Sequence, residues 1–293
     1  MKLGTNDIGS VYLGTNAVQK VYLGTNEVWS AVDPDAQAFF DRVTTAGGSL
    51  STTEQEAVNT LVVQMKADGI WTKMKAIYPM VGASAAACAQ NLKSSSYTGS
   101  FTSGWTFAST GINGNGTNSY FNTNFNGSTQ LSNNNIHISG YSRSQKYPNT
   151  TSTPMIVMAA LGSGSNLLDL EIINASSANK TASYIYDYDA NKGILEIATT
   201  STLGFYTSTR TSTSSHKIYK NGTTIATSTT ASNYNNAPNV NLYLGALNNN
   251  GSLLFSNNIN FAFASIGDGL TDTEASDLYT AVQSFQTTLS RNV

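Results

Sequence analysis

The sequence has few charged residues, a single cysteine and no long apolar run. Of its 293 residues 11% are charged, against about 25% in ordinary soluble proteins. Because Cys88 is the only cysteine, a disulfide framework within the chain and a zinc site with two cysteines are both excluded. No apolar window reaches the roughly 18 residues that a membrane-spanning helix needs, so we expect no membrane insertion.

The weak charge also limits the choice of partners. The net charge is −2 and there is no basic run, which removes the electrostatic attraction that dominates nucleic-acid binding. Met1 and Lys2 lead directly into polar sequence, without the apolar segment of a signal peptide. We therefore expect synthesis in a reducing cytoplasm, although the uncharged surface, rich in Asn, Thr and Ser, is typical of proteins that function outside cells.

A ten-residue repeat fills residues 1–32. The motif Leu-Gly-Thr-Asn occurs three times, each time followed by a hydrophobic residue two positions later. Gly and Asn favour tight turns, and the flanking alternation favours short strands. About thirty residues of this kind cannot bury a core of their own, so we expect an attachment or oligomerisation segment; a simple β-meander capping the next domain is the alternative. Its characteristic residues are Leu3, Gly4, Leu13, Gly14, Leu23, Gly24 and Trp29.

Residues 33–93 carry helix signals. Asp33-Pro34 predicts a helix start, and Ser51 with Glu54 forms a capping box before a second helix that should stop at Gly69. We expect a small helical linker domain.

Residues 94–293 are mainly β. Strand-like runs separated by turn clusters are typical of sandwiches and jelly rolls. A last capping box, Thr271 with Glu274, predicts a closing helix over residues 272–290. The fold class predicted is therefore a mainly β protein, an antiparallel β-sandwich with an N-terminal short-strand repeat, a small helical segment and a C-terminal helix.

Three motifs in the second half resemble a laminin-G-like, concanavalin-type jelly roll. They are residues 215–222 (SHKIYKNG), 240–246 (VNLYLGA) and 269–274 (GLTDTE), which occur in the order that such jelly rolls show. The resemblance covers about residues 95–293 and implies a concanavalin-like sandwich.

A second resemblance is to structural proteins of bacteriophages, including those infecting Bacteroidetes. It rests on the Leu-Gly-Thr-Asn repeats ending in Val28-Trp29 and on residues 33–39, 69–79, 91–93 and 115–120. It implies a place on the virion surface as a fibre, spike, decoration or tail protein. Capsid and tail stay open as alternatives, and no catalytic or binding residue follows from the resemblance.

Signals for catalysis or metal binding are sparse. The two histidines are His137, on the opposite strand face from its isoleucine neighbours, and His216, which we expect at the surface. Residues 187–193 (DYDANKG) superficially match a calcium loop, but the spacing of an EF-hand is not met and a hairpin turn is the better interpretation. We expect no cofactor and no metal.

Asp169 and Glu171 alternate on one face of an apolar strand. Concanavalin-type glucanases also use carboxylates that alternate along a strand, but Asn174 stands where their last acid would be. We therefore favour a solvated strand face over a catalytic pair.

Four aromatic residues lie among Asn and Ser and could form a platform for sugars: Trp105, Tyr120, Phe121 and Tyr141. Aromatic rings with polar neighbours suit such contacts, and packing in the core or between subunits is the other explanation.

The sequence as a whole favours a virion structural protein without enzymatic activity. We expect it to contact other virion proteins, to form a homo-oligomer, most simply a trimer, and to display a jelly roll that binds host surface glycans. The alternative is a glycan depolymerase that uses Asp169 and Glu171.

Overall fold

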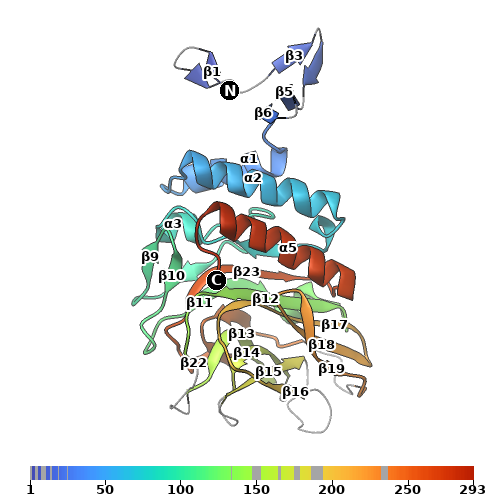
Figure 1. Cartoon of the computed structure of the whole chain (residues 1–293). Helices are drawn as coiled ribbons and strands as arrows, with labels where there is room; N and C mark the ends of the chain where they lie inside the picture. Colours follow the sequence, from blue (N-terminus) through green and yellow to red (C-terminus); the bar gives the residue numbers. More distant parts are fainter. Residues whose placement is uncertain are drawn as a thin grey trace.

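The computed structural model describes residues 2–3, 6–7, 11–13, 15–18, 20–24, 26–132, 134–146, 153–163, 166–174, 179–185, 194–231 and 237–293. In these residues the chain forms an arm of hairpins, a layer of helices and a two-sheet β-sandwich (Figure 1). The mainly β, antiparallel sandwich predicted from the sequence is confirmed.

Each decapeptide forms one hairpin, and the hairpins pair only within themselves in the described part of the chain. In every copy the leucine pairs with the asparagine of the same motif, for example Leu13 with Asn16. Gly24 has φ +65°, the left-handed conformation that two-residue hairpin turns require. The strands are β1 (Lys2–Leu3), β2 (Asn6–Asp7), β3 (Val11–Leu13), β4 (Asn16–Val18), β5 (Lys20–Leu23) and β6 (Asn26–Ser30).

The three long helices begin where the sequence predicts, whereas three short ones were not expected. The side chains of Asp33, Ser51 and Thr271 cap their helices by accepting from backbone N–H groups, the last two within complete capping boxes. The helices are α1 (Pro34–Thr45), α2 (Thr52–Ala67), the 3-10 helix η1 (Trp71–Lys73), α3 (Ala85–Cys88), α4 (Gly127–Gln130) and α5 (Asp272–Thr288).

The first sheet, sheet I, has the order β19-β18-β17-β12-β23-β10-β9, with β7 paired to β23. Its strands are β7 (Met74–Tyr78), β9 (Thr106–Ala108), β10 (Gly111–Asn113), β12 (Ile136–Ser142), β17 (Gly204–Ser212), β18 (Ser215–Lys220), β19 (Thr223–Ser228) and β23 (Asn260–Gly267).

The second sheet, sheet II, has the order β16-β15-β14-β13-β20-β11-β8, and a short hairpin of β21 and β22 joins it alongside β13. Its strands are β8 (Ser100–Phe101), β11 (Phe121–Asn126), β13 (Met155–Leu161), β14 (Leu167–Ile173), β15 (Lys180–Ile185), β16 (Ile194–Ala198), β20 (Asn241–Leu244), β21 (Leu247–Asn249) and β22 (Ser252–Leu254).

Two cores hold these layers together. One lies between the sheets, and the other lies between sheet I and the helices α1, α2 and α5. Figure 1 shows the helices stacked on sheet I, on the side away from sheet II. Residues 33–93 therefore do not form the separate linker domain expected: β7 pairs with β23, so this segment is built into the sandwich.

Candidate functional site

The arm exposes large apolar side chains. Tyr12, Leu13 and Leu23 are 63, 78 and 75% exposed. The two leucines occupy equivalent positions beside the turns of successive hairpins, because each pairs with the asparagine that closes its turn. Figure 1 shows the hairpins beyond α1 and α2, away from the sandwich.

The remaining attachment residues are only partly visible. Leu3 pairs with Asn6 in the first hairpin, and Trp29 pairs with Val21 in the third. Gly4 and Gly14 lie outside the described residues. The structure thus places the three leucines at matching positions of the three hairpins. Trp29 has no equivalent among the described residues of the other two, because the third hairpin contains a register shift.

The four predicted aromatic residues do not form one platform. Phe121 is fully buried between the sheets, and Tyr141 is fully buried under the helices. Trp105 and Tyr120 are partly exposed. The prediction of a platform fails for Phe121 and Tyr141 because both faces of sheet I and the inner face of sheet II are covered, so alternation along a strand does not bring a residue to solvent.

Tyr120 instead stacks on a residue that the sequence analysis did not single out. Its ring lies 4.1 Å from that of Tyr243, with an angle of 16° between the planes. Burial, and next the hydrogen bond with Tyr120, raise the pKa of Tyr243 to about 12, so the Tyr243 side chain carries no charge near neutral pH. Trp105 packs edge-on against Phe101 at 5.6 Å.

Asp169 and Glu171 lie on one face of β14, as predicted, but this face is not solvated. Their side chains are 3 and 6% exposed and lie on the face of sheet II turned away from sheet I. Asp169 pairs with Ala159 and Tyr184 on the neighbouring strands, where these side chains form a small apolar cluster. The expectation of a solvated strand face was therefore wrong.

The geometry of this pair does not suit glycoside hydrolysis. Burial raises the pKa of Asp169, and the adjacent Glu171, to which it is hydrogen bonded, raises it further. Each carboxyl group therefore has the other as a close neighbour. Because both side chains are almost completely buried, a substrate in solvent does not reach either carboxyl group.

The histidines are both fully buried, so the expectation of a surface position for His216 was wrong. His216 Nε2 lies 3.1 Å from Ser208 Oγ and 3.2 Å from Ser183 Oγ. Because Ser208 belongs to sheet I and Ser183 to sheet II, this contact joins the two sheets.

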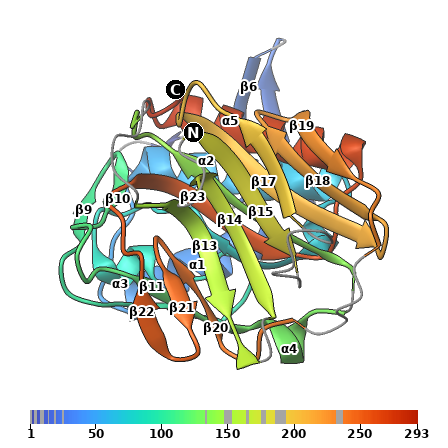
Figure 2. The same ribbon diagram turned by 90° about the horizontal axis from the view of Figure 1, so that it is seen from below.

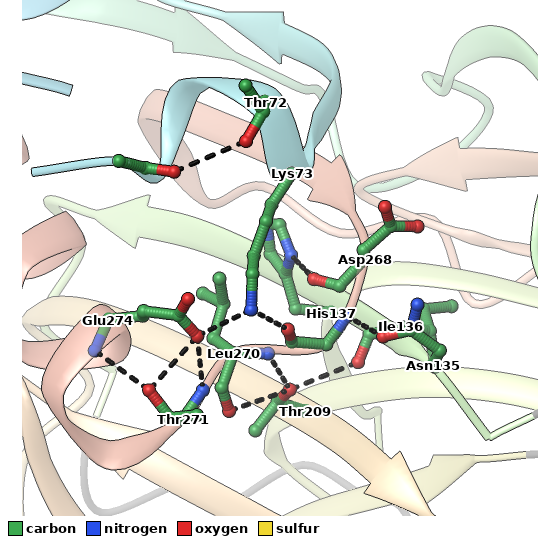
Figure 3. A network of polar contacts seen from close by, with 12 residues as sticks. Thr72, Lys73, Asn135, Ile136, His137, Thr209, Asp268, Leu270, Thr271 and Glu274 are labelled. Atoms are coloured by element: carbon green, nitrogen blue, oxygen red, sulfur yellow. Dashed lines mark hydrogen bonds and ion pairs between the residues drawn. The ribbon is translucent and has the colours of Figure 1, made fainter. Parts of the chain in front are cut away.

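His137 belongs to a polar network between η1, sheet I and the start of α5 (Figure 3). Its Nδ1 lies 2.6 Å from the carbonyl oxygen of Asp268 and its Nε2 lies 3.1 Å from Ser265 Oγ. Nδ1 donates to the carbonyl, so Nε2 accepts from the serine hydroxyl. The three serines that contact the histidines meet only buried rings, and the described residues hold no Ser-His-Asp triad in reach of a substrate.

The rest of this network fixes the last helix. Lys73 Nζ lies 2.6 Å from Glu274 Oε2 and donates to the Gly269 carbonyl at 3.1 Å, while Thr209 Oγ1 accepts from Leu270 N at 2.8 Å. Figure 3 shows these side chains converging on the residues that lead into α5. We therefore assign this network a structural role, which is to hold the start of α5 against sheet I and η1.

Within the described ranges, no group of three or more His, Cys, Asp or Glu side chains could hold a metal ion. The calcium-like motif of residues 187–193 lies outside those ranges. Among the helices of the described part, none combines the length and the apolar character needed to cross a membrane.

No protein-family model and no curated protein sequence matches this chain. Among solved structures, domain 4 of an extracellular arabinanase from Geobacillus stearothermophilus, in complex with arabinotriose, is 15% identical with a TM-score of 0.47, over 70% of this chain and 98% of that domain. A sialidase from Streptococcus pneumoniae is 14% identical with a TM-score of 0.40, over 52% of this chain and 25% of the sialidase.

A carbohydrate-binding module from a Ruminococcus gnavus sialidase, bound to sialyllactose, is 15% identical with a TM-score of 0.38, over 51% of this chain and 84% of the module. The chain thus spans about a quarter of the length of the pneumococcal sialidase it matches. The β-sandwich assignment rests on the strand order of the chain itself.

Proposed function

We propose that this protein is a structural component of a bacteriophage particle, made in the host cytoplasm and placed on the virion surface. Residues 1–32 form its attachment arm, and the helix-covered sandwich faces outward. The observation that carries this proposal is the arm: a triple repeat folded as separate hairpins that expose Leu13 and Leu23. The resemblance of the repeats to bacteriophage structural proteins supports it.

The body does not need the arm for its own stability. Among the described residues, the buried cores of the body begin at Ala36 and contain no residue of the arm. A two-stranded hairpin alone is marginally stable at best, so the arm must gain its stability from surfaces outside its own chain. Attachment to a larger assembly provides such surfaces.

Other copies of the same chain are the simplest of these surfaces. The hairpins share the motif Leu-Gly-Thr-Asn, so every copy of the chain offers similar strand edges and the same exposed residues Leu13 and Leu23. The arm carries Lys2, Asp7, Lys20 and Glu27 as its only charged residues and has no net charge, so repulsion does not oppose assembly. We propose a homo-oligomer, with a trimer favoured, that contacts the capsid or the tail.

Imaging of intact particles with antibodies against residues 94–293 tests the virion location. Regular labelling at one position on the particle is the expected result. Purified particles that contain no copy of the chain would rule the proposal out.

A second candidate function, recognition of a host surface glycan, is favoured by Tyr120. Its partly exposed ring, held flat against Tyr243, provides the apolar face with polar edges that sugars contact. Binding of the full-length chain to a glycan array tests this function, and no binding to any glycan would reject it.

We propose a role in binding and not in catalysis. A depolymerase acting through Asp169 and Glu171 would need these side chains to contact substrate, and both are buried. The measurement is release of reducing ends from host polysaccharide, and we expect none. Degradation that disappears in the Asp169→Ala variant would instead establish the enzyme.

A further inference from the structure

Phe255 has an unusual backbone conformation and an exposed side chain. Its φ is +55°, in the left-handed region that residues with bulky side chains rarely adopt. The side chain is 44% exposed, and that of the preceding Leu254 is 39% exposed. The fold therefore adopts a strained backbone conformation at Phe255 while leaving much of this aromatic residue in solvent.

Neighbouring hydrogen bonds impose this conformation. Ser256 Oγ donates to the Ser119 carbonyl at 2.7 Å, and Asn257 Nδ2 donates to the Ile156 carbonyl at 2.7 Å. The backbone N–H of Asn257 also donates to the Gly245 carbonyl at 3.0 Å. Three hydrogen bonds thus hold the turn after β22 in place. Backbone strain that is maintained by surrounding contacts is often associated with function.

The same contacts bring the turn close to other aromatic residues. Ser119 directly precedes Tyr120, which stacks on Tyr243. A Cβ atom at Gly245 would lie 3.2 Å from the ring of Trp105. Trp105 therefore lies beside Gly245, whose carbonyl holds the backbone of Asn257. Figure 2 shows β22, β21 and β11 close together at one end of sheet II. We call this end, with Phe255, Tyr120 and Trp105, the aromatic end.

The strands of the aromatic end carry no charge. Residues 94–142, 147–168 and 221–267 contain no Asp, Glu, Lys or Arg. These ranges include β8 to β13 and β19 to β23. The exposed polar side chains beside the turn are amides, such as Asn118 and Asn258. Such a surface has no means of attracting an acidic or basic partner over a distance, but its amides can exchange hydrogen bonds with hydroxyl groups.

We propose that the aromatic end binds neutral carbohydrate, with Phe255 and Tyr120 stacked against sugar rings and the neighbouring amides bonded to sugar hydroxyls. This proposal rests on glycan recognition, the second candidate function above, and gives it a location and a ligand class. It also differs from the platform expected from the sequence, because Phe255 takes the place of Phe121 and Tyr141.

The test uses the full-length chain and an array of neutral and sialylated oligosaccharides, followed by calorimetry with a neutral oligosaccharide that binds. We expect binding to neutral oligosaccharides only, with affinity insensitive to sodium chloride. The Phe255→Asn variant should lose about tenfold or more in affinity. It should keep its melting temperature, because Asn tolerates the left-handed conformation.

Two further variants serve as controls. Phe255→Tyr retains the ring and should bind like the wild type. Val63→Asn removes an exposed apolar side chain of α2, outside both the arm and the aromatic end, and should leave the affinity unchanged. Wild-type affinity in Phe255→Asn, with neutral sugars still bound, would overturn the proposed location and leave glycan recognition standing. Preference for sialylated sugars would overturn the ligand class. No binding at all would reject both glycan recognition and this proposal. A smaller assembly for Phe255→Asn would show that Phe255 is a contact between copies, which also overturns the proposal.

Discussion

Asp169 and Glu171 are next-but-one neighbours on β14, and their carboxyl groups share a hydrogen bond while both side chains are almost fully buried. Two such groups cannot both ionise without strong repulsion, so the pair retains a proton. The Oδ1 atom of Asp169 has no hydrogen-bond partner among the described residues. The free energy of unfolding therefore decreases as the pH rises and the retained proton is lost.

The first prediction concerns this pH dependence. The folded protein raises the pKa of Asp169 above its unfolded value, so the folded state binds the extra proton. Its contribution to stability is full below the unfolded pKa and is lost as the pH rises through the folded one. At pH 8 we expect the Asp169→Asn variant to be more stable than the wild type, with a free energy of unfolding that is higher by about 1–3 kcal/mol.

Urea denaturation between pH 4 and pH 9 measures this difference. Glu196→Gln, on β16 of the same sheet, removes a carboxylate that is partly exposed and paired with Lys180, and it serves as the control with little change. A wild type and an Asp169→Asn variant with parallel pH profiles would contradict the assignment.

The second prediction concerns acid. Burial lowers the pKa of His137 from its usual 6.5 to about 4. The unfolded chain therefore binds the proton first, and stability that is full above pH 6.5 is lost as the pH falls towards 4. For this residue the loss by pH 4 is about 3 kcal/mol at most.

The His137→Gln variant should be less stable than the wild type at pH 7, with a smaller decrease between pH 7 and pH 4. Thermal or urea unfolding at both values gives the comparison. Equal decreases in both proteins would mean that His137 does not titrate with the fold.

The third prediction concerns Arg291, whose side chain holds the C-terminal end of the chain against the residues after β7 and against β23. Its guanidinium is 1% exposed and donates to the carbonyls of Met80, Pro79 and Ala262 at 2.7 to 2.9 Å. Arg291→Met nearly keeps the volume but removes the guanidinium donors of the Met80 and Pro79 carbonyls and one of the two donors at Ala262, so we expect a loss of about 3–5 kcal/mol in unfolding free energy.

Lys66→Met is the matched control, because it removes a cation whose salt bridges with Asp33 and Asp35 are exposed. Such surface pairs contribute about 1 kcal/mol or less. Equal losses in the two variants would show that the buried contacts of Arg291 contribute no more than surface contacts do.

The helices and most strands could be predicted from local signals. Asp33, Ser51 and Thr271 are side-chain caps, whose effect depends only on the next few residues. The closing helix ends at Thr288, two residues before the expected position. The turns of the arm were predictable for the same reason, since Gly and Asn tolerate the required conformations.

The site could be predicted only in part, because burial depends on distant layers. Every residue of β12 is buried, so alternation could not tell that Tyr141 faces the helices. His216 meets Ser183 of the other sheet, a contact that no local pattern contains. The strained backbone of Phe255 has no sequence signal at all, because its cause is hydrogen bonds made by Ser256 and Asn257.

The mass of the full-length chain in solution tests the central claim most directly, namely that the arm carries assembly. We predict a homo-oligomer, with a trimer favoured, by light scattering or sedimentation at micromolar concentration. The double variant Leu13→Asn, Leu23→Asn should be monomeric with an unchanged melting temperature, because neither leucine contributes to the buried cores of the described chain. A wild-type chain that is monomeric, with an arm that proteases remove freely, would contradict the claim.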